Sequence, residues 1–127
     1  MKKPLILLFS LIISFNSYGE WKFMGGTSNG SSLFYLDENT IKEHNGYVYY
    51  WLMTDYLEPS ETGRMSNKMY FQGECGINRI KTLSYIFYNE PMGNGKGDQS
   101  KGEDEWDYPD PRGAWANMIN YVCNYVD

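Results

Sequence analysis

The sequence predicts an α+β fold, a single antiparallel β-sheet of about five to six strands with a C-terminal α-helix packed on it and one disulfide. Three observations favour it. Short β-forming segments are separated by glycine, proline and asparagine, as in antiparallel sheets. A helical apolar pattern occurs only near the end of the chain. The aromatic content of 17% is typical of a sheet whose rings pack while their polar tips reach water.

The first nineteen residues have the pattern of a secretory signal peptide. Lys2 and Lys3 precede an apolar run at residues 5–13, and Ser17 and Gly19 supply small residues near the cleavage point. The run is too short for a membrane span, which needs roughly 20 apolar residues, so a retained membrane anchor is the weaker alternative. We therefore expect an exported chain that begins at about residue 20, without a membrane span after cleavage.

Composition limits the exported part to one domain. Residues 20–127 can form a single core. Removing Lys2 and Lys3, and no acid, changes the formal charge from −5 to −7. Such a chain repels phosphate backbones and has no dense basic cluster, so we expect no nucleic-acid partner. No cysteine lies near residue 19, so we also expect no lipid anchor and a periplasmic, secreted or cell-surface location.

Five segments are predicted strands: residues 21–24, 33–37, 47–56, 65–75 and 77–89. Residues 37–41 fit a short turn or one turn of helix, and Asn45-Gly46 fits a tight hairpin. In the strand at 47–56, Tyr47, Tyr49 and Trp51 alternate with apolar or aromatic neighbours, so both faces have the composition of buried surface. This predicts a central strand with a helix on one side and loops, a partner or a second copy on the other. Ordinary burial of both faces is the alternative.

Residues 90–105 are rich in glycine and charge and have no apolar period, so we expect a mobile loop. The glycines around Lys96 do not form a nucleotide-binding loop, because Asp98 and no helix follow. The acidic residues from Glu103 to Asp110 lack the ligand spacing of an EF-hand, so they are interpreted as solvated charge. We predict no cofactor and no metal.

The closing segment is the predicted helix. Asp110 is a suitable N-cap, Pro111 a suitable first residue, and the helix should continue to about residue 125. One apolar stripe should face the sheet, formed by Trp115, Met118, Ile119, Val122 and Cys123.

Cys75 and Cys123 are the only cysteines, and the signal directs them to an oxidising compartment. An even number there predicts a disulfide, with two free thiols as the alternative. The bond would join the last turn of the helix to the end of the strand at 65–75. The single histidine, His44, completes no zinc spacing with them. It also has no visible nucleophile partner, so we expect no enzyme.

Several segments together resemble the surface-adhesin protein E family. They are Trp21-Lys22, Phe34-Tyr35-Leu36-Asp37 with Thr40-Ile41, the run from Val48 to Tyr56, an acid before Cys75, Asp110-Pro111-Arg112-Gly113, and Cys123 at the end of a helix. The resemblance covers nearly all of residues 20–127. It implies a small antiparallel sheet with a helix packed on it, association into a homodimer, and adhesion to host extracellular-matrix or plasma proteins. The family offers no catalytic motif.

A binding module needs an accessible patch, and aromatic and basic side chains supply most interface anchors. The candidate partner-binding residues are therefore Tyr47, Tyr49, Trp51, Lys96, Lys101, Trp106 and Tyr108. The competing interpretation of Trp106 and Tyr108 is that they cover a sheet edge. The alternative function is a periplasmic accessory or inhibitor protein whose negative charge suits a basic protein target.

Overall fold

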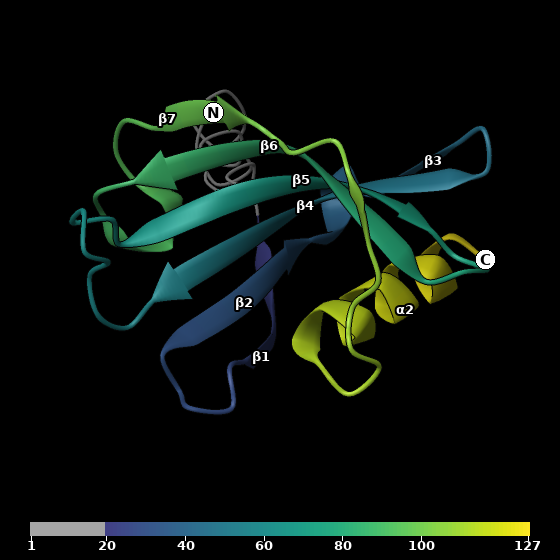
Figure 1. Cartoon of the computed structure of the whole chain (residues 1–127), viewed down its shortest axis with the longest axis horizontal. Coiled ribbons are helices and arrows are strands. Elements are labelled where there is room, and N and C mark those ends of the chain that lie inside the picture. The colour runs from purple at the N-terminus through teal and green to yellow at the C-terminus, as the bar shows by residue number, and fades with distance from the viewer. Residues whose placement is uncertain (1–19) are drawn as a thin grey trace, which may run out of the picture.

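The structure is a computed structural model that describes residues 20–127, so the predicted signal peptide lies outside the described residues and stays a prediction. One antiparallel sheet dominates, with the strand order β1-β2-β4-β5-β6-β7, while β3 pairs with β4 and β8 with β6. The sheet is curved, and the helix α2 packs beneath one of its faces (Figure 1). The strands are β1 (Trp21–Gly26), β2 (Ser32–Asp37), β3 (Lys42–His44), β4 (Tyr47–Tyr56), β5 (Ser66–Glu74), β6 (Arg79–Tyr88), β7 (Asp98–Lys101) and β8 (Trp106–Asp107); the helices are the short 3₁₀ segments η1 (Glu38–Thr40) and η2 (Pro91–Gly93), and α2 (Ala114–Val126).

The antiparallel sheet with one helix is confirmed, but the prediction of five to six strands is wrong, because the sheet has eight. The unpredicted strands are short and polar. All residues of β3 and β7 are exposed, and β8 has only two residues. Their backbones extend the hydrogen-bond ladder at the margins of the sheet without burying a face. They therefore lack the alternating apolar pattern by which a strand is recognised.

Two predicted turns are confirmed. Residues 38–40 form η1, where the Asp37 carboxylate accepts a hydrogen bond from the backbone N–H of Asn39. Asn45 and Gly46 both have positive φ values, 51° and 83°, and they join β3 to β4. A two-residue turn of this kind matches the twist of the strands on either side.

The core lies between the sheet and α2. Met118, Ile119 and Val122 of the helix are buried, as predicted from the apolar stripe, and Trp115 and Cys123 pack at the margin. They meet a set of buried sheet residues: Phe34, Leu36, Val48, Tyr50, Leu52, Met69, Phe71 and Ile80. A Cβ at Gly73 would lie 3.0 Å from Ile119 Cδ1. The absence of a side chain at Gly73 thus allows the helix to approach the sheet closely.

The predicted start of this helix is wrong. The helix begins at Ala114, and Gly113 is its N-cap. Asp110 instead closes a turn, since its side chain accepts a hydrogen bond from the backbone N–H of Arg112 and its carbonyl accepts one from the N–H of Gly113. The aspartate and Pro111 thus shape the turn before the helix, which is the other common use of an Asp-Pro pair.

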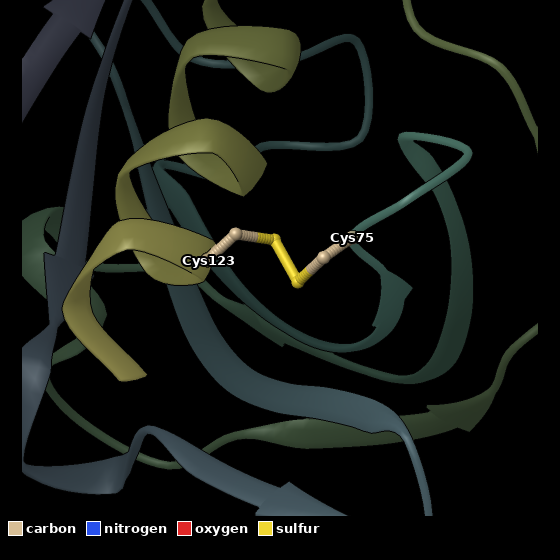
Figure 2. Close-up of a disulfide and its surroundings, with 2 residues drawn as sticks. All are labelled: Cys75 and Cys123. Atoms are coloured by element: carbon tan, nitrogen blue, oxygen red, sulfur yellow. A yellow bond between two sulfur atoms is a disulfide. The ribbon is translucent and has the colours of Figure 1, made fainter. Parts of the chain in front are cut away.

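A disulfide joins Cys75 and Cys123, as predicted (Figure 2). Cys75 directly follows β5, and Cys123 lies near the end of α2. On the other side of the helix, the hydroxyl of Tyr121 donates a hydrogen bond to the carboxylate of Glu38 in η1. The helix is therefore tied to the sheet on both sides.

The segment 90–105 is not the unstructured loop that was expected. It contains η2 and β7, and β7 pairs with β6 from Ser84 to Phe87. Glycine makes this course possible: a Cβ at Gly102 would lie 1.9 Å from the carbonyl oxygen of Thr82. Gly102, one of the glycines that suggested mobility, therefore serves close backbone packing.

Candidate binding face

We define the open face as the side of the sheet opposite α2. In an antiparallel pair, directly opposed residues share a face, so the register assigns each side chain. Gly73 and Val48 lie on the helix side, so their sequence neighbours belong to the open face. The aromatic residues of that face are Trp21, Phe23, Tyr35, Tyr47, Tyr49, Trp51, Tyr70 and Tyr88, and β8 adds Trp106.

Three rings on β4 and β5 form the centre of the open face. The Trp51 and Tyr70 ring centroids are 4.8 Å apart, and those of Tyr49 and Tyr70 are 6.2 Å apart, with interplanar angles of 32° and 27°. These separations are close to the spacing of neighbouring strands. The rings therefore stand beside one another on the sheet, and they direct their edges and polar tips outward. All three rings are half-buried. Burial raises the pKa of Tyr70, and the nearby Tyr49 raises it further.

Trp106 of β8 lies beside this centre, over Tyr47, Arg79 and Lys81. Its ring stacks on Tyr47 with centroids 5.9 Å apart. The guanidinium carbon of Arg79 lies 4.0 Å from the centroid of the same ring, and Lys81 Nζ lies 4.7 Å from it. Contacts of this kind are favourable because the face of an aromatic ring is electronegative. Trp106 therefore holds two cations against the open face.

Carboxylates on the open face are engaged by the protein itself. Glu74 pairs with Arg79 at 2.7 Å, and Asp104 pairs with Lys81 at 3.4 Å. The hydrogen bond between Arg79 and Glu74 raises the pKa of Arg79. Asp37 caps η1, and Asp55 accepts a hydrogen bond from the backbone N–H of Met92.

One end of the open face is covered by η2. Gly93 donates a backbone hydrogen bond to the hydroxyl of Ser66, which in turn donates to the carbonyl of Glu90. Met53 lies on the same face of β4 as Trp51, and it is fully buried beneath η2. The strand β4 thus has both expected covers, a helix on one face and a loop over part of the other.

Five of the seven candidate residues belong to the open face. Tyr47, Tyr49, Trp51 and Trp106 are the half-buried rings described above. Lys101 lies at the margin, opposite Ser84 on β6.

The other two candidates lie elsewhere. Lys96 is exposed between η2 and β7, towards the covered end of the sheet. Tyr108 is 65% exposed beyond β8. Lys96 is therefore apart from the aromatic centre, whereas Tyr108 lies close to Arg79 at the margin of the open face.

Among the residues of this face that sequence reasoning missed, Tyr70, Arg79 and Lys81 lie beside the predicted rings. In β5, Lys68, Tyr70 and Gln72 alternate with the buried residues Met69 and Phe71. The sequence therefore indicated that these three residues share one face of the strand. What the sequence did not provide was the pairing of β5 with β4 and β6, which brings these residues beside Trp51 and Trp106.

Other parts of the described chain offer less. Residues 20–127 contain no group of three or more His, Cys, Asp or Glu side chains that could hold a metal ion. His44 is exposed, and its ring bonds to the Asn45 amide. A hollow of about 870 Å³ lies beside the start of α2, but its charged lining, Asp110 and Arg112, pairs with itself. Within the same residues, none of the helices has the length and apolar character needed to cross a membrane.

Comparisons with known proteins agree with this architecture. The model of the family described as surface-adhesin protein E matches residues 21–124. One crystal form of Haemophilus influenzae protein E is 19% identical, with a TM-score of 0.64 over 84% of this chain and 91% of that chain. Protein E from non-typeable Haemophilus influenzae is 17% identical, with a TM-score of 0.53 over 83% and 78%. A search of curated proteins finds no match. The structural likenesses establish the fold, and the family match over most of the chain establishes that this protein belongs to the surface-adhesin protein E family.

Proposed function

We propose that this protein is an exported, non-catalytic binding module that attaches to host matrix or plasma proteins through its open face. Family membership supports a role in adhesion. The observation that carries the proposal is the cluster of half-buried rings around Tyr70, flanked by the cations that Trp106 holds. Tyrosine, tryptophan and arginine are the residues that dominate binding energy in protein interfaces.

The location of the chain tests the first half of the proposal. The full chain is expressed with a C-terminal tag, and intact cells are treated with protease before and after the outer membrane is opened. Cleavage on intact cells, or recovery from the medium, is the expected result. Protection until the membrane is opened would contradict the adhesin role and favour the alternative, a periplasmic accessory or inhibitor protein.

Binding tests the second half. The processed protein, purified from cells expressing the full chain, is applied to a panel of immobilised matrix and plasma proteins. We expect at least one to be retained, and the retention to be lost when Tyr49 and Trp51 are replaced together by serine. The matched control is Tyr125→Ser, because Tyr125 is 51% exposed on α2, away from the open face. Equal loss in both variants would contradict a role for this face. Association of two copies stays a prediction, to be measured by light scattering on the same samples.

A further inference from the structure

The charge of the open face differs from that of the rest of the protein. Residues 20–127 contain nine basic and sixteen acidic residues. Five of the basic and four of the acidic residues lie on the open face, so four basic and twelve acidic residues lie elsewhere. The basic residues are Lys42, Lys68, Arg79, Lys81 and Lys101. The rest of the protein thus carries a large excess of acidic residues, so an acidic partner is repelled less by the open face than by the remaining surface taken together.

The arrangement of the rings favours anions as well. Trp51, Tyr70 and Tyr49 lie side by side, with Tyr70 next to both of the other rings. The edge of an aromatic ring is electropositive, and tyrosine hydroxyls and the indole N–H are hydrogen-bond donors.

The strand order sets the spacing between the charged margins. Lys42 on β3 opposes Tyr49, which opposes Gln72, which opposes Lys81 on β6. Three strand spacings separate the two lysines, or about 14 Å between their Cα atoms. An extended peptide that crosses the strands covers this distance in about four residues.

We propose that the open face binds an extended acidic segment of a partner protein, with carboxylates about four residues apart and apolar or aromatic side chains between them. This inference rests on the proposed function and names the class of partner. A protein segment fits this face better than a sulfated polysaccharide. The centre of the face is a group of aromatic rings, its cations are dispersed, and its basic residues outnumber its acidic residues by only one. A highly charged polysaccharide is bound by a dense basic cluster.

A selection experiment tests the chemistry of the partner. The purified, processed protein is immobilised through a tag at Asp127, beyond α2 and away from the open face, and a displayed library of random dodecapeptides is selected on it. We expect enriched peptides with two acidic residues at a spacing of about four and apolar residues between them. Failure to enrich any peptide, or a basic or uncharged consensus, would overturn the inference.

Fluorescence anisotropy with the selected consensus peptide then locates the site. Lys42→Gln with Lys81→Gln should weaken binding about tenfold, because both cations whose spacing the acidic segment matches are lost. Arg112→Gln with Lys22→Gln removes the same charge on the helix side and should leave the affinity within about twofold. Tyr49→Phe with Tyr70→Phe keeps the stacked rings and should weaken binding about fivefold through lost hydroxyl donors. Equal effects of the two charge variants would contradict a site on the open face.

Two further binding measurements distinguish an acidic peptide from a general polyanion. A peptide with glutamine in place of both acids should bind at least tenfold more weakly, and heparin should not compete below the concentration at which general salt screening acts. Strong competition by heparin at low concentration would replace the acidic segment with a polyanion. Retention of a matrix or plasma protein by the Lys42→Gln, Lys81→Gln variant would uphold the proposed function and overturn this inference.

Discussion

The ring of Trp106 stacks on the ring of Tyr47 with centroids 5.9 Å apart, although β8 and β4 are not hydrogen-bonded neighbours. Two strands, β5 and β6, lie between them in the sheet. The indole therefore reaches across the open face, and Arg79 and Lys81 pack on it. This side-chain contact reinforces a strand of only two residues and links both halves of the face.

Trp106→Ala should lower the free energy of unfolding by about 2 kcal/mol, because the stack and two cation contacts are lost from a half-buried ring. Tyr108→Ala should change it by less than about 0.5 kcal/mol, since that ring is exposed. Urea titration of the two single variants measures the difference. Similar losses would show that Tyr108 also packs on the sheet. A double variant would mix stability with binding, so the two positions should be tested singly.

Replacing Cys75 and Cys123 by serine should destabilise the protein by about 4 kcal/mol. The bond closes a loop of about 49 residues, and the chain-entropy model assigns that value to the lost constraint on the unfolded chain. Guanidinium titration of the variant and of the wild-type protein under non-reducing conditions, which keep the bond of the wild type intact, measures the difference. An unchanged midpoint would mean that the remaining contacts of α2 suffice to hold it.

Gly73→Ala should destabilise by about 1–3 kcal/mol, because the added Cβ would lie 3.0 Å from Ile119 Cδ1 and 3.1 Å from Val48 Cγ2. Ile119→Val removes that Cδ1 and should cost about 1 kcal/mol by itself. The double variant should be more stable than the sum of the two effects predicts, since the valine makes room for the alanine. Strict additivity in a double-mutant cycle would argue against this contact between α2 and β5.

Stability should be constant up to about pH 10 and fall at higher pH. Burial raises the pKa of Tyr50 above its ordinary value of 10.0, and burial also raises the pKa values of Tyr56 and Tyr85. The unfolded chain then loses its tyrosine protons at lower pH than the folded chain, so rising pH favours unfolding, for Tyr50 by up to about 1.4 kcal/mol per pH unit.

Urea midpoints at pH 8 and pH 11 test this behaviour. Tyr50→Phe should reduce the loss between the two values, because one raised pKa is removed. Tyr125→Phe is the control, since that side chain is exposed on α2. The same loss in the wild-type protein and in Tyr50→Phe would show that Tyr50 does not couple folding to alkaline pH.

Much of the candidate site could be predicted from the alternating pattern of β4. Tyr47, Tyr49 and Trp51 share a face because successive side chains of a strand point to opposite sides. Tyr70 and Arg79 could not be added to that face from the sequence, because their position depends on which strands pair and in which register. The bulge between Tyr70 and Phe71 shifts that register, and local sequence does not specify it.

Errors in the fold had a related cause. The strands β3, β7 and β8 are defined by backbone hydrogen bonds at the margins of the sheet, where no apolar alternation is needed. The glycines of residues 90–105 suggested a loop, but Gly102 instead allows the chain to pass against the backbone of β6. At Asp110, two local motifs compete for the same side chain, and the turn before α2 prevails over the helix cap.

The sequence by itself determined the fold class, the long strands β4 to β6, the apolar stripe of α2 and the pairing of its two cysteines. These follow from periodicity, composition and cysteine number, which act over short distances along the chain. Only the tertiary structure decided where the marginal strands lie, which side chains share the open face, and that Trp106 is placed above it. Those outcomes depend on contacts between residues that are distant in sequence, and the free energy of such contacts is set by the packed sheet as a whole.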